Sequence, residues 1–172
     1  MKIRHSVLVG AAVAVLAFGF GNLAHRAEGA DAADARLQRL EDIEAIRTLL
    51  VRYGRELDKR DFAAYGALFA QDGSWKGGMG TATGPEAIAN MVAAGFERMS
   101  PTLYTSSNHV MSSFDIAVDG DTASAWSRWT WVVVGAAGKP ETHRAGHYED
   151  TLVRERGEWK FKTRQAFTEI NP

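Results

Sequence analysis

Apolar residues recur at three- and four-residue steps over the first part of the chain and at two-residue steps over the rest. The first series predicts one long amphipathic helix, whose apolar positions are Leu37, Leu40, Ile43, Ile46, Leu50, Tyr53 and Leu57. A second helix is predicted from about Phe62 to Phe69, followed by a turn at Gln71-Asp72-Gly73 and a short strand from Ser74 to Lys76. A third helix is predicted to begin at Thr83-Gly84-Pro85-Glu86, where Thr and Glu have the spacing of a capping box.

From Tyr104 onward the apolar period is two, which predicts long strands. The predicted strands are Ser106 to Val118, Thr122 to Val134, Thr142 to Arg154 and Glu158 to Phe167. Because helices come first and hairpin-connected strands follow, the predicted class is α+β, with helices covering one face of a curved sheet. Which strand face turns inward stays open, since one bulge would invert the register.

The N-terminal segment differs in composition from the rest. Lys2, Arg4 and His5 form a basic start, and residues 6–24 carry no charge. This pattern is typical of a secretory signal peptide, and its length also fits a membrane anchor. We therefore predict a signal peptide or anchor over residues 1–30, a small-residue linker over 31–36 and one domain over 37–172. The domain is expected to be exported, either periplasmic or secreted, and the anchor reading would hold it at a membrane.

Composition excludes several classes of function. The chain has 172 residues, a formal net charge of -1 and no cysteine. Disulfides, thiol catalysis and cysteine-based metal sites are therefore excluded. The absence of a basic stripe argues against nucleic-acid binding. His143 and His147 share a strand face but lie about 13 Å apart at the usual strand rise, so no metal site is predicted there.

Asp58 stands out within the charged sequence Asp58-Lys59-Arg60-Asp61 that follows the first helix. Asp61 is explained as the N-cap of the second helix. Asp58 lies in the last turn of the first helix, where the helix dipole disfavours a carboxylate. It is therefore either a solvated acid or an acid held in place for chemistry. His109 has the same two readings, as an ordinary strand histidine or as a base.

Three motifs together carry a resemblance to a known family. The motifs are Tyr53-x4-Asp58-x2-Asp61-x7-Phe69-x2-Asp72-Gly73, then His109 opening a long strand, then Gly146-x-Tyr148-x-Asp150 with Gly157-x-Trp159-Lys160-Phe161. This order resembles the SnoaL-like branch of the nuclear transport factor 2-like superfamily, from about Leu37 to Phe167. The resemblance implies a cone-shaped barrel, in which a strongly bent mixed sheet wraps three N-terminal helices and encloses one deep apolar pocket.

The resemblance also implies a chemistry. The Asp and His positions are similar to those of scytalone dehydratase, bile acid 7-alpha-dehydratase and hexachlorocyclohexane dehydrochlorinase, which are elimination lyases without metal or organic cofactor. By this resemblance Asp58, His109 and Tyr53 are the candidate catalytic residues. The candidate substrate-binding residues are Tyr148, Trp75, Met111, Trp131 and His147. Trp75 stands where some relatives carry a tyrosine, so no phenol hydrogen bond is carried over to it.

The residue types fit that chemistry independently of the family. An imidazole has a reference pKa of about 6.5, so at neutral pH it is mostly the free base. A carboxylate on its other ring nitrogen fixes the tautomer and stabilises the imidazolium. Gly54, one turn before Asp58, leaves space beside it, and Tyr53 or Tyr148 could protonate a departing oxygen.

The predicted function is that of an exported, cofactor-free, dehydratase-like lyase acting on a hydrophobic small molecule. Two alternatives stay open: a non-catalytic small-molecule-binding accessory protein, and an isomerase of the ketosteroid-isomerase kind. A homodimer or homotrimer is expected, formed through a sheet face that carries Trp126 or Trp129.

Overall fold

The computed structural model describes residues 10–99, 107–135 and 137–170, with side chains from residue 29 onward. Its helices are α1 (Gly10–Lys59), α2 (Phe62–Gly66) and α3 (Pro85–Glu97). Its strands are β1 (Phe69–Gly77), β2 (Gly80–Thr83), β3 (Ser107–Asp119), β4 (Thr122–Val134), β5 (Pro140–Glu155) and β6 (Glu158–Ile170). The chain divides into two compact units, residues 1–41 and residues 42–172.

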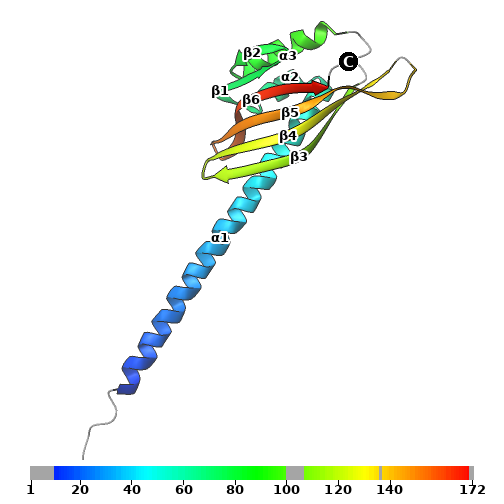
Figure 1. The fold of residues 1–172 in the computed structure, drawn as a ribbon. Coiled ribbons are helices and arrows are strands. Elements are labelled where there is room, and N and C mark those ends of the chain that lie inside the picture. Colours follow the sequence, from blue (N-terminus) through cyan, green and yellow to red (C-terminus); the bar gives the residue numbers. More distant parts are fainter. Residues whose placement is uncertain (1–9, 100–106, 136, 171–172) are drawn as a thin grey trace, which may run out of the picture. The chain divides into compact units, whose positions relative to one another are not determined.

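The second unit is built on one six-stranded sheet in the order β2-β1-β6-β5-β4-β3 (Figure 1). β1 pairs with β6 in parallel, and every other neighbouring pair is antiparallel, so the sheet is mixed. The predicted α+β class with N-terminal helices and a curved mixed sheet is confirmed.

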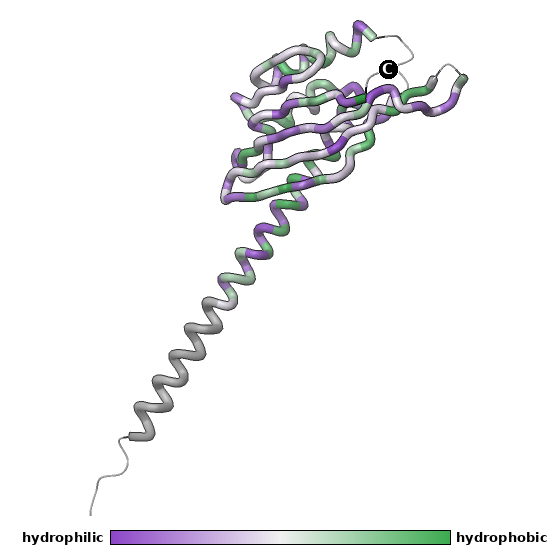
Figure 2. The backbone as a smooth tube through the Cα atoms, viewed as in Figure 1, coloured by the Kyte–Doolittle hydropathy of each residue, from purple (hydrophilic) through white to green (hydrophobic). Residues whose placement is uncertain are grey.

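Hydrophilic and hydrophobic residues alternate along the long strands (Figure 2), and the alternation of buried and exposed positions sorts the sheet into two faces. The inner face of β4 carries Trp129, Trp131 and Val133, and that of β5 carries Tyr148 and Leu152. These side chains pack against buried residues of the helices, namely Ile46, Leu50, Tyr53, Leu57, Tyr65, Ile88, Val92 and Phe96. Burial of these apolar surfaces is the main force that holds the helices to the sheet.

A bulge changes the inward-facing side of β3 halfway along the strand. The pairing with β4 shifts between Ser112 and Asp115, and Ser113 has a φ of 53°. His109 and Met111 turn toward the core before the bulge, and Phe114 and Ile116 do so after it. An extra residue on one strand reverses the alternation in this way, so both halves of β3 present apolar side chains to the helices.

The N-terminal part of α1 departs from the predicted boundaries. The helix continues without a break through residues 31–36, which we predict as a linker. That segment is rich in alanine, the strongest helix former. Leu37 and Leu40, which the periodicity places on the core face, are exposed, and burial in the second unit begins at Asp42. Among the described residues, no helix combines the length and apolarity that a membrane span requires. Residues 1–9, which hold the basic start, lie outside the described part of the chain.

Two local predictions are also corrected. The second helix ends at Gly66, and the predicted turn at Gln71-Asp72-Gly73 lies inside β1, where it appears as a register shift against β6. Gly73 lies so close to the backbones of Ala70 and Phe161 that a Cβ would collide with them. The N-cap of α3 is Gly84, not Thr83, and it makes no side-chain capping hydrogen bond. A φ of 88° explains why glycine occupies it.

Candidate functional site

Asp58 and His109 are in direct contact, although 51 positions separate them in the sequence. Asp58 Oδ1 lies 2.7 Å from His109 Nδ1, and both carboxylate oxygens accept from the His109 backbone N–H, at 3.0 and 2.9 Å. A carboxylate can only accept, so the ring proton lies on Nδ1 and Nε2 is left as the basic nitrogen. The unfavourable position of Asp58 at the end of α1 is thus compensated by three hydrogen bonds from one residue of β3.

Gly54 allows α1 and β3 to approach closely enough for this contact. A Cβ placed on Gly54 would lie 3.3 Å from His109 Cβ and 3.2 Å from Met111 Cγ. Arg60 adds a second link between the same elements, because its guanidinium donates to Ser107 Oγ at 2.6 Å. The geometry of the Asp58–His109 pair therefore depends on a small residue one turn before Asp58 and on an arginine just after it.

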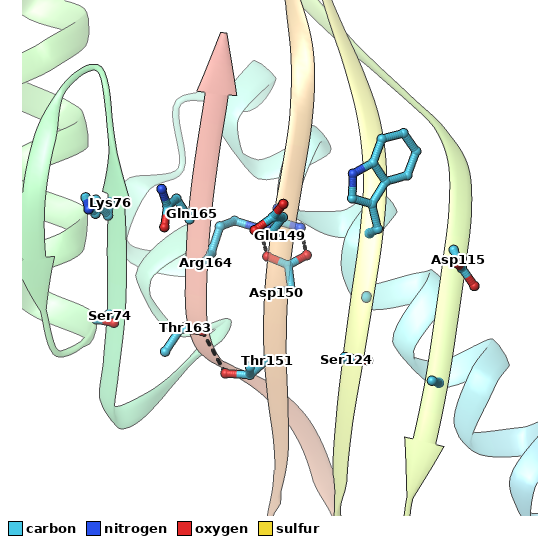
Figure 3. A pocket seen from close by; sticks show the side chains of 13 residues that line it. Ser74, Lys76, Asp115, Ser124, Glu149, Asp150, Thr151, Thr163, Arg164 and Gln165 are labelled. Carbon is cyan, nitrogen blue, oxygen red and sulfur yellow. Dashed lines mark hydrogen bonds and ion pairs between the residues drawn. The ribbon is translucent and has the colours of Figure 1, made fainter.

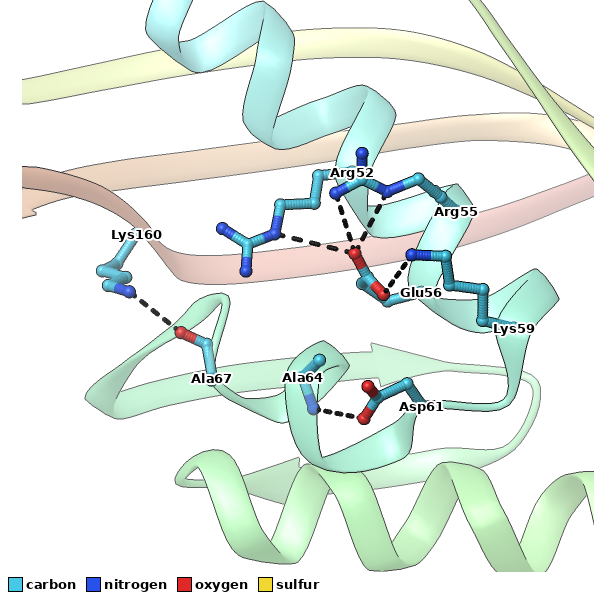
Figure 4. A network of polar contacts seen from close by, with 8 residues as sticks. All are labelled: Arg52, Arg55, Glu56, Lys59, Asp61, Ala64, Ala67 and Lys160. Carbon is cyan, nitrogen blue, oxygen red and sulfur yellow. Dashed lines mark hydrogen bonds and ion pairs between the residues drawn. The ribbon is translucent and has the colours of Figure 1, made fainter.

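The neighbouring acid, Glu56, has a different environment (Figure 4). Its buried carboxylate lies within 4 Å of three cations of the same helix, Arg52, Arg55 and Lys59. Figure 4 also shows Asp61 accepting from the backbone N–H of Ala64 at 2.9 Å, which confirms Asp61 as the N-cap of α2. Unlike Glu56 and Asp61, Asp58 binds an imidazole.

His109 lines a small cavity between the sheet and the helices. The cavity has a volume of about 120 Å³ and is lined mainly by aromatic and other apolar side chains. The predicted site residues Tyr53, Trp75, His109, Trp131 and Tyr148 all line it. Residues that the sequence reasoning did not assign to a site also line it, namely Leu57, Gly78, Met79, Phe96, Met99, Trp129, Arg144, Ala166 and Thr168.

Tyr53 is held by two hydrogen bonds at the wall of this cavity. Its hydroxyl oxygen accepts from the Tyr65 hydroxyl at 2.8 Å and from Trp75 Nε1 at 2.9 Å. Trp75 thus supplies an indole N–H instead of the phenol that some relatives carry. With both lone pairs of its oxygen engaged, Tyr53 has its own O–H proton left to donate.

Beneath Tyr53 and Tyr148 lies a buried ion pair that the sequence reasoning missed. Arg164 donates to both oxygens of Asp150, at 2.7 and 2.6 Å, and its guanidinium lies 3.9 Å from the Tyr53 ring centre and 4.1 Å from that of Tyr148. Burial raises the pKa of Asp150, and the adjacent guanidinium opposes that rise. Burial, reinforced by Tyr53, also raises the pKa of Tyr148 well above its usual value, so this phenol keeps its proton at neutral pH.

Two of the predicted substrate-binding residues, His147 and Met111, do not line the cavity. His147 lies on the outer face of β5, because strand alternation sends it away from its cavity-lining neighbour Tyr148. There its ring stacks on Trp126 and Phe167, and Nδ1 lies 2.7 Å from Glu169 Oε1. Met111 shares the inner face of β3 with His109 but packs beside Gly54.

A wider hollow crosses the sheet at β1, β6, β5, β4 and β3 (Figure 3). It measures about 620 Å³, and its lining includes the charged side chains of Lys76, Asp115, Glu149, Asp150 and Arg164. Figure 3 shows that several of its polar groups bind each other. Arg164 Nε donates a hydrogen bond to Asp150 Oδ1 at 2.7 Å, and the hydroxyl oxygens of Thr151 and Thr163 are 2.7 Å apart. Because it contains no histidine and its buried charges are paired, we place the candidate site in the smaller cavity. In the described part of the chain, no group of three or more metal-ligating side chains lies close enough to hold an ion.

Comparison with known proteins places this geometry in a family. Residues 38–165 match the SnoaL-like domain family. An NTF2-like protein with a cystatin-like fold from Novosphingobium aromaticivorans is 31% identical, with 77% of this chain and 84% of that chain covered and a TM-score of 0.69. No curated protein matches the sequence significantly.

Two further solved structures, both from Novosphingobium aromaticivorans, share the fold. A protein provisionally named scytalone dehydratase is 25% identical over 77% of this chain and 87% of that chain, with a TM-score of 0.61. The beta subunit of a provisionally assigned aromatic-ring-hydroxylating dioxygenase is 19% identical over 78% and 93%, with a TM-score of 0.65. The fold thus includes dehydratases and small-molecule-binding proteins. This chain belongs to the SnoaL-like domain family and has the NTF2-like fold.

Proposed function

We propose that this protein is a lyase that removes water from a small hydrophobic molecule, with His109 as the base and Asp58 as its orienting partner. The observation that carries the proposal is the 2.7 Å contact between Asp58 Oδ1 and His109 Nδ1 at the wall of an apolar cavity. The likeness to a protein provisionally named scytalone dehydratase supports the same reaction class.

The residues at the cavity supply the groups that such an elimination needs. His109 Nε2 is the basic nitrogen, and the Asp58 carboxylate stabilises the imidazolium that forms when it takes a proton from carbon. Tyr53 and Tyr148 line the same cavity, and their hydroxyl groups can deliver a proton to the departing hydroxyl oxygen. The apolar walls exclude water, which strengthens these electrostatic interactions. This chemistry uses side chains of this chain alone.

The test is proton exchange and water loss in heavy water. The full chain is incubated with a panel of single-ring alcohols in which the C–H bond on the carbon next to the alcohol carbon is acidic. Proton NMR follows both the uptake of deuterium at that carbon and the formation of the alkene product. We expect uptake and alkene formation on at least one compound, and loss of both in His109→Ala. Arg128→Gln, a change on the outer face, serves as the control and should keep both.

The same experiment separates the alternatives. Deuterium uptake without water loss, followed by movement of a double bond, would identify an isomerase. Saturable ligand binding without uptake on any compound would favour the non-catalytic binding protein and contradict the lyase. Uptake that persists in His109→Ala would show that another base acts, which would overturn the assignment of the pair.

We also propose that the domain is exported. The support is the basic start at Lys2, Arg4 and His5 followed by the uncharged residues 6–24. Fusion of residues 1–35 to a reporter that is active only outside the cytoplasm should give signal, and membrane fractionation distinguishes an anchored protein from a released one. A reporter that stays inactive would contradict export.

We further propose that the protein is a homodimer or homotrimer that associates through the outer sheet face. On that face Trp126 is partly exposed and stacks on His147. Sedimentation of the full chain at micromolar concentration should show an oligomer, which Trp126→Glu should weaken. A wild-type protein that sediments only as a monomer would contradict the proposal.

A further inference from the structure

Two hydrogen-bond donors at the cavity wall have no partner. Trp131 Nε1 and Arg144 Nε are both buried, and neither makes a hydrogen bond within the described part of the chain. Both residues line the cavity that contains His109. Arg144, which is partly buried, also forms no ion pair with any described carboxylate, whereas the fully buried Arg164 is bound to Asp150. Buried donors are almost always satisfied, so unpaired donors beside a cavity indicate a ligand that accepts from them.

The sheet places these donors in one row with the candidate base. Trp131 lies directly opposite His109 on β3 and directly opposite Arg144 on β5. The rings of His109 and Trp131 stack at 5.6 Å with an interplanar angle of 12°. Two strand spacings separate His109 from Arg144, which is about 10 Å between their Cα atoms. The backbone positions of His109 and Arg144 therefore lie on either side of Trp131 in the sheet.

The size of the cavity limits what can lie in that row. Its volume is about 120 Å³, and an apolar protein cavity of about 150 Å³ accommodates benzene. A single six-membered ring is therefore comparable in size to this cavity. Such a ring can place one edge at His109 and an oxygen substituent at Trp131 and Arg144.

We propose that Arg144 and Trp131 Nε1 bind a carbonyl or carboxylate oxygen of the substrate, which is then a single-ring β-hydroxy carbonyl compound. This inference rests on the lyase function proposed above and specifies its substrate class. A guanidinium without a carboxylate partner at an apolar cavity favours an oxygen that carries or develops negative charge. Arg144 and Trp131 thus supply the hydrogen-bond donors that stabilise the negative charge on this oxygen when the C–H bond breaks.

The reaction balances within these residues. His109 Nε2 takes the proton from the carbon next to the carbonyl, and the C–H electron pair moves onto the carbonyl oxygen, where Arg144 and Trp131 donate to it. The enolate then forms the carbon–carbon double bond as the β C–O bond breaks. The departing hydroxide takes a proton from Tyr53 or Tyr148, the imidazolium returns its proton to that phenolate, and one water is released. No oxidant or reductant is required.

Binding of benzoate and toluene tests the oxygen site directly, because the two have similar shapes and differ in the acceptor group. Titrations of the full chain are followed by NMR. Wild-type protein should bind benzoate more tightly than toluene. Arg144→Gln should weaken benzoate binding by about 10- to 100-fold, the value of a charged hydrogen bond, and leave toluene binding unchanged. Arg144→Lys should restore part of the loss, and Trp131→Phe should weaken benzoate binding less than Arg144→Gln.

Arg128→Gln is the matched control, since it removes the same charge from the outer face, where Arg128 is paired with Glu169. It should leave both affinities unchanged. Equal responses of benzoate and toluene to Arg144→Gln would overturn the oxygen site. Should Arg144→Gln fail to fold, Trp131→Phe decides alone: selective loss of benzoate supports the site, and unchanged selectivity refutes it.

The binding test addresses the oxygen site and the turnover test addresses the lyase function, so each can fail without the other. If benzoate binding depends on Arg144 but no compound exchanges a proton, the oxygen site stands and the lyase function is wrong. If proton exchange occurs while benzoate binding ignores Arg144 and Trp131, the lyase function stands and the substrate class is wrong.

Discussion

Within the described residues, His109 and His147 each form a hydrogen bond of the same length with a carboxylate, but the two pairs have different surroundings. Asp58 with His109 and Glu169 with His147 both have an Nδ1–oxygen distance of 2.7 Å. Both imidazoles also stack on a tryptophan, His109 on Trp131 and His147 on Trp126. Hydrogen-bond geometry alone therefore does not distinguish a candidate base from a surface histidine.

The difference lies in what else contacts each pair. Glu169 is shared with Arg128 at 2.9 Å, and the Nε2 of His147 lies 3.7 Å from a second acid, Glu149. In the inner pair, every polar contact described for the Asp58 carboxylate comes from His109, which lines the cavity. The His109 side chain is 8% exposed, against 17% for His147. The Asp58 carboxylate is bound to His109 alone among the contacts described, and His109 lines an apolar cavity; these two features favour the inner pair for proton transfer.

The largest effect on turnover should come from replacing the carboxylate of the inner pair. Asp58→Asn should lower turnover by about 10⁴-fold, as the equivalent change does in a serine protease triad, because an amide can hold the wrong tautomer and cannot stabilise imidazolium. Glu169→Gln makes the same chemical change in the outer pair and should leave turnover unchanged. The measurement is the rate of proton exchange or water loss on the substrate found in the panel.

Two observations control this comparison. The losses in Asp58→Asn and His109→Ala should not add in the double variant, since the two residues act as one unit. The melting temperature of Asp58→Asn should be unchanged or raised, because residues held for function often cost stability. Full activity in Asp58→Asn would refute the inner pair, whatever the outer pair does.

The second comparison is between a buried arginine–carboxylate pair, Arg164 with Asp150, and an exposed one, Arg128 with Glu169. Arg164→Met leaves the Asp150 carboxylate buried without its partner and should lower the free energy of unfolding by about 3–5 kcal/mol. Arg128→Gln removes an exposed pair and should change it far less. Urea unfolding of both variants measures the difference.

The double variant Arg164→Met/Asp150→Leu sharpens this result. It replaces the whole pair by apolar groups and should recover much of the stability lost in Arg164→Met, because no charge is left buried. A double variant less stable than the single one would show instead that the pair is a net source of stability.

The contrast between these regions also shows what could be predicted from the sequence. Regular alternation on β4 and β5 sorts Trp131 and Tyr148 from Trp126 and His147, and the structure keeps that sorting. The same alternation places His147 on the face opposite Tyr148, away from the cavity. The same rule, counted four residues back from Tyr148, would have placed Arg144 in the cavity.

Irregular strands explain most of what could not be predicted. On β6, alternation from Trp159 and Phe161 would turn Arg164 outward, but a register shift against β5 turns it into the core. On β3, the bulge at Ser113 reverses the alternation after His109 and Met111. Bulges depend on how neighbouring strands pair, so no local sequence pattern around Arg164 or Ser113 predicts them. The pairing of Asp58 with His109 is what the resemblance to the SnoaL-like family implies.

Gly54 tests how closely the inner pair depends on its packing. In Gly54→Ala the added methyl group would press on His109 and Met111 and move β3 away from α1. We expect turnover to fall by about 10-fold, since a 1 Å misplacement can cost about 10²-fold. Stability should change little, because alanine favours the helix by about 1 kcal/mol and offsets the strain.

Gly29→Ala is the matched control for Gly54→Ala. Gly29 lies in the same helix with nothing near its Cβ position, so the change should favour the helix without affecting turnover. Unchanged turnover in Gly54→Ala would show that the contact between Asp58 and His109 tolerates a wider spacing of α1 and β3.

The smallest effect should come from the outer pair, as a change in how stability depends on pH. The hydrogen bond from His147, with a further one from Arg128, lowers the pKa of Glu169 below its usual value of 4.5. A carboxylate with a lowered pKa in the folded state stabilises the protein above its unfolded pKa, and this contribution disappears as the pH falls through the folded value. Glu169→Gln should therefore be slightly less stable than wild type at neutral pH and converge with it below about pH 4.5. Urea unfolding of both proteins between pH 7 and pH 3 measures this convergence, and a difference that persists or grows in acid would show that Glu169 acts through packing and not through its charge.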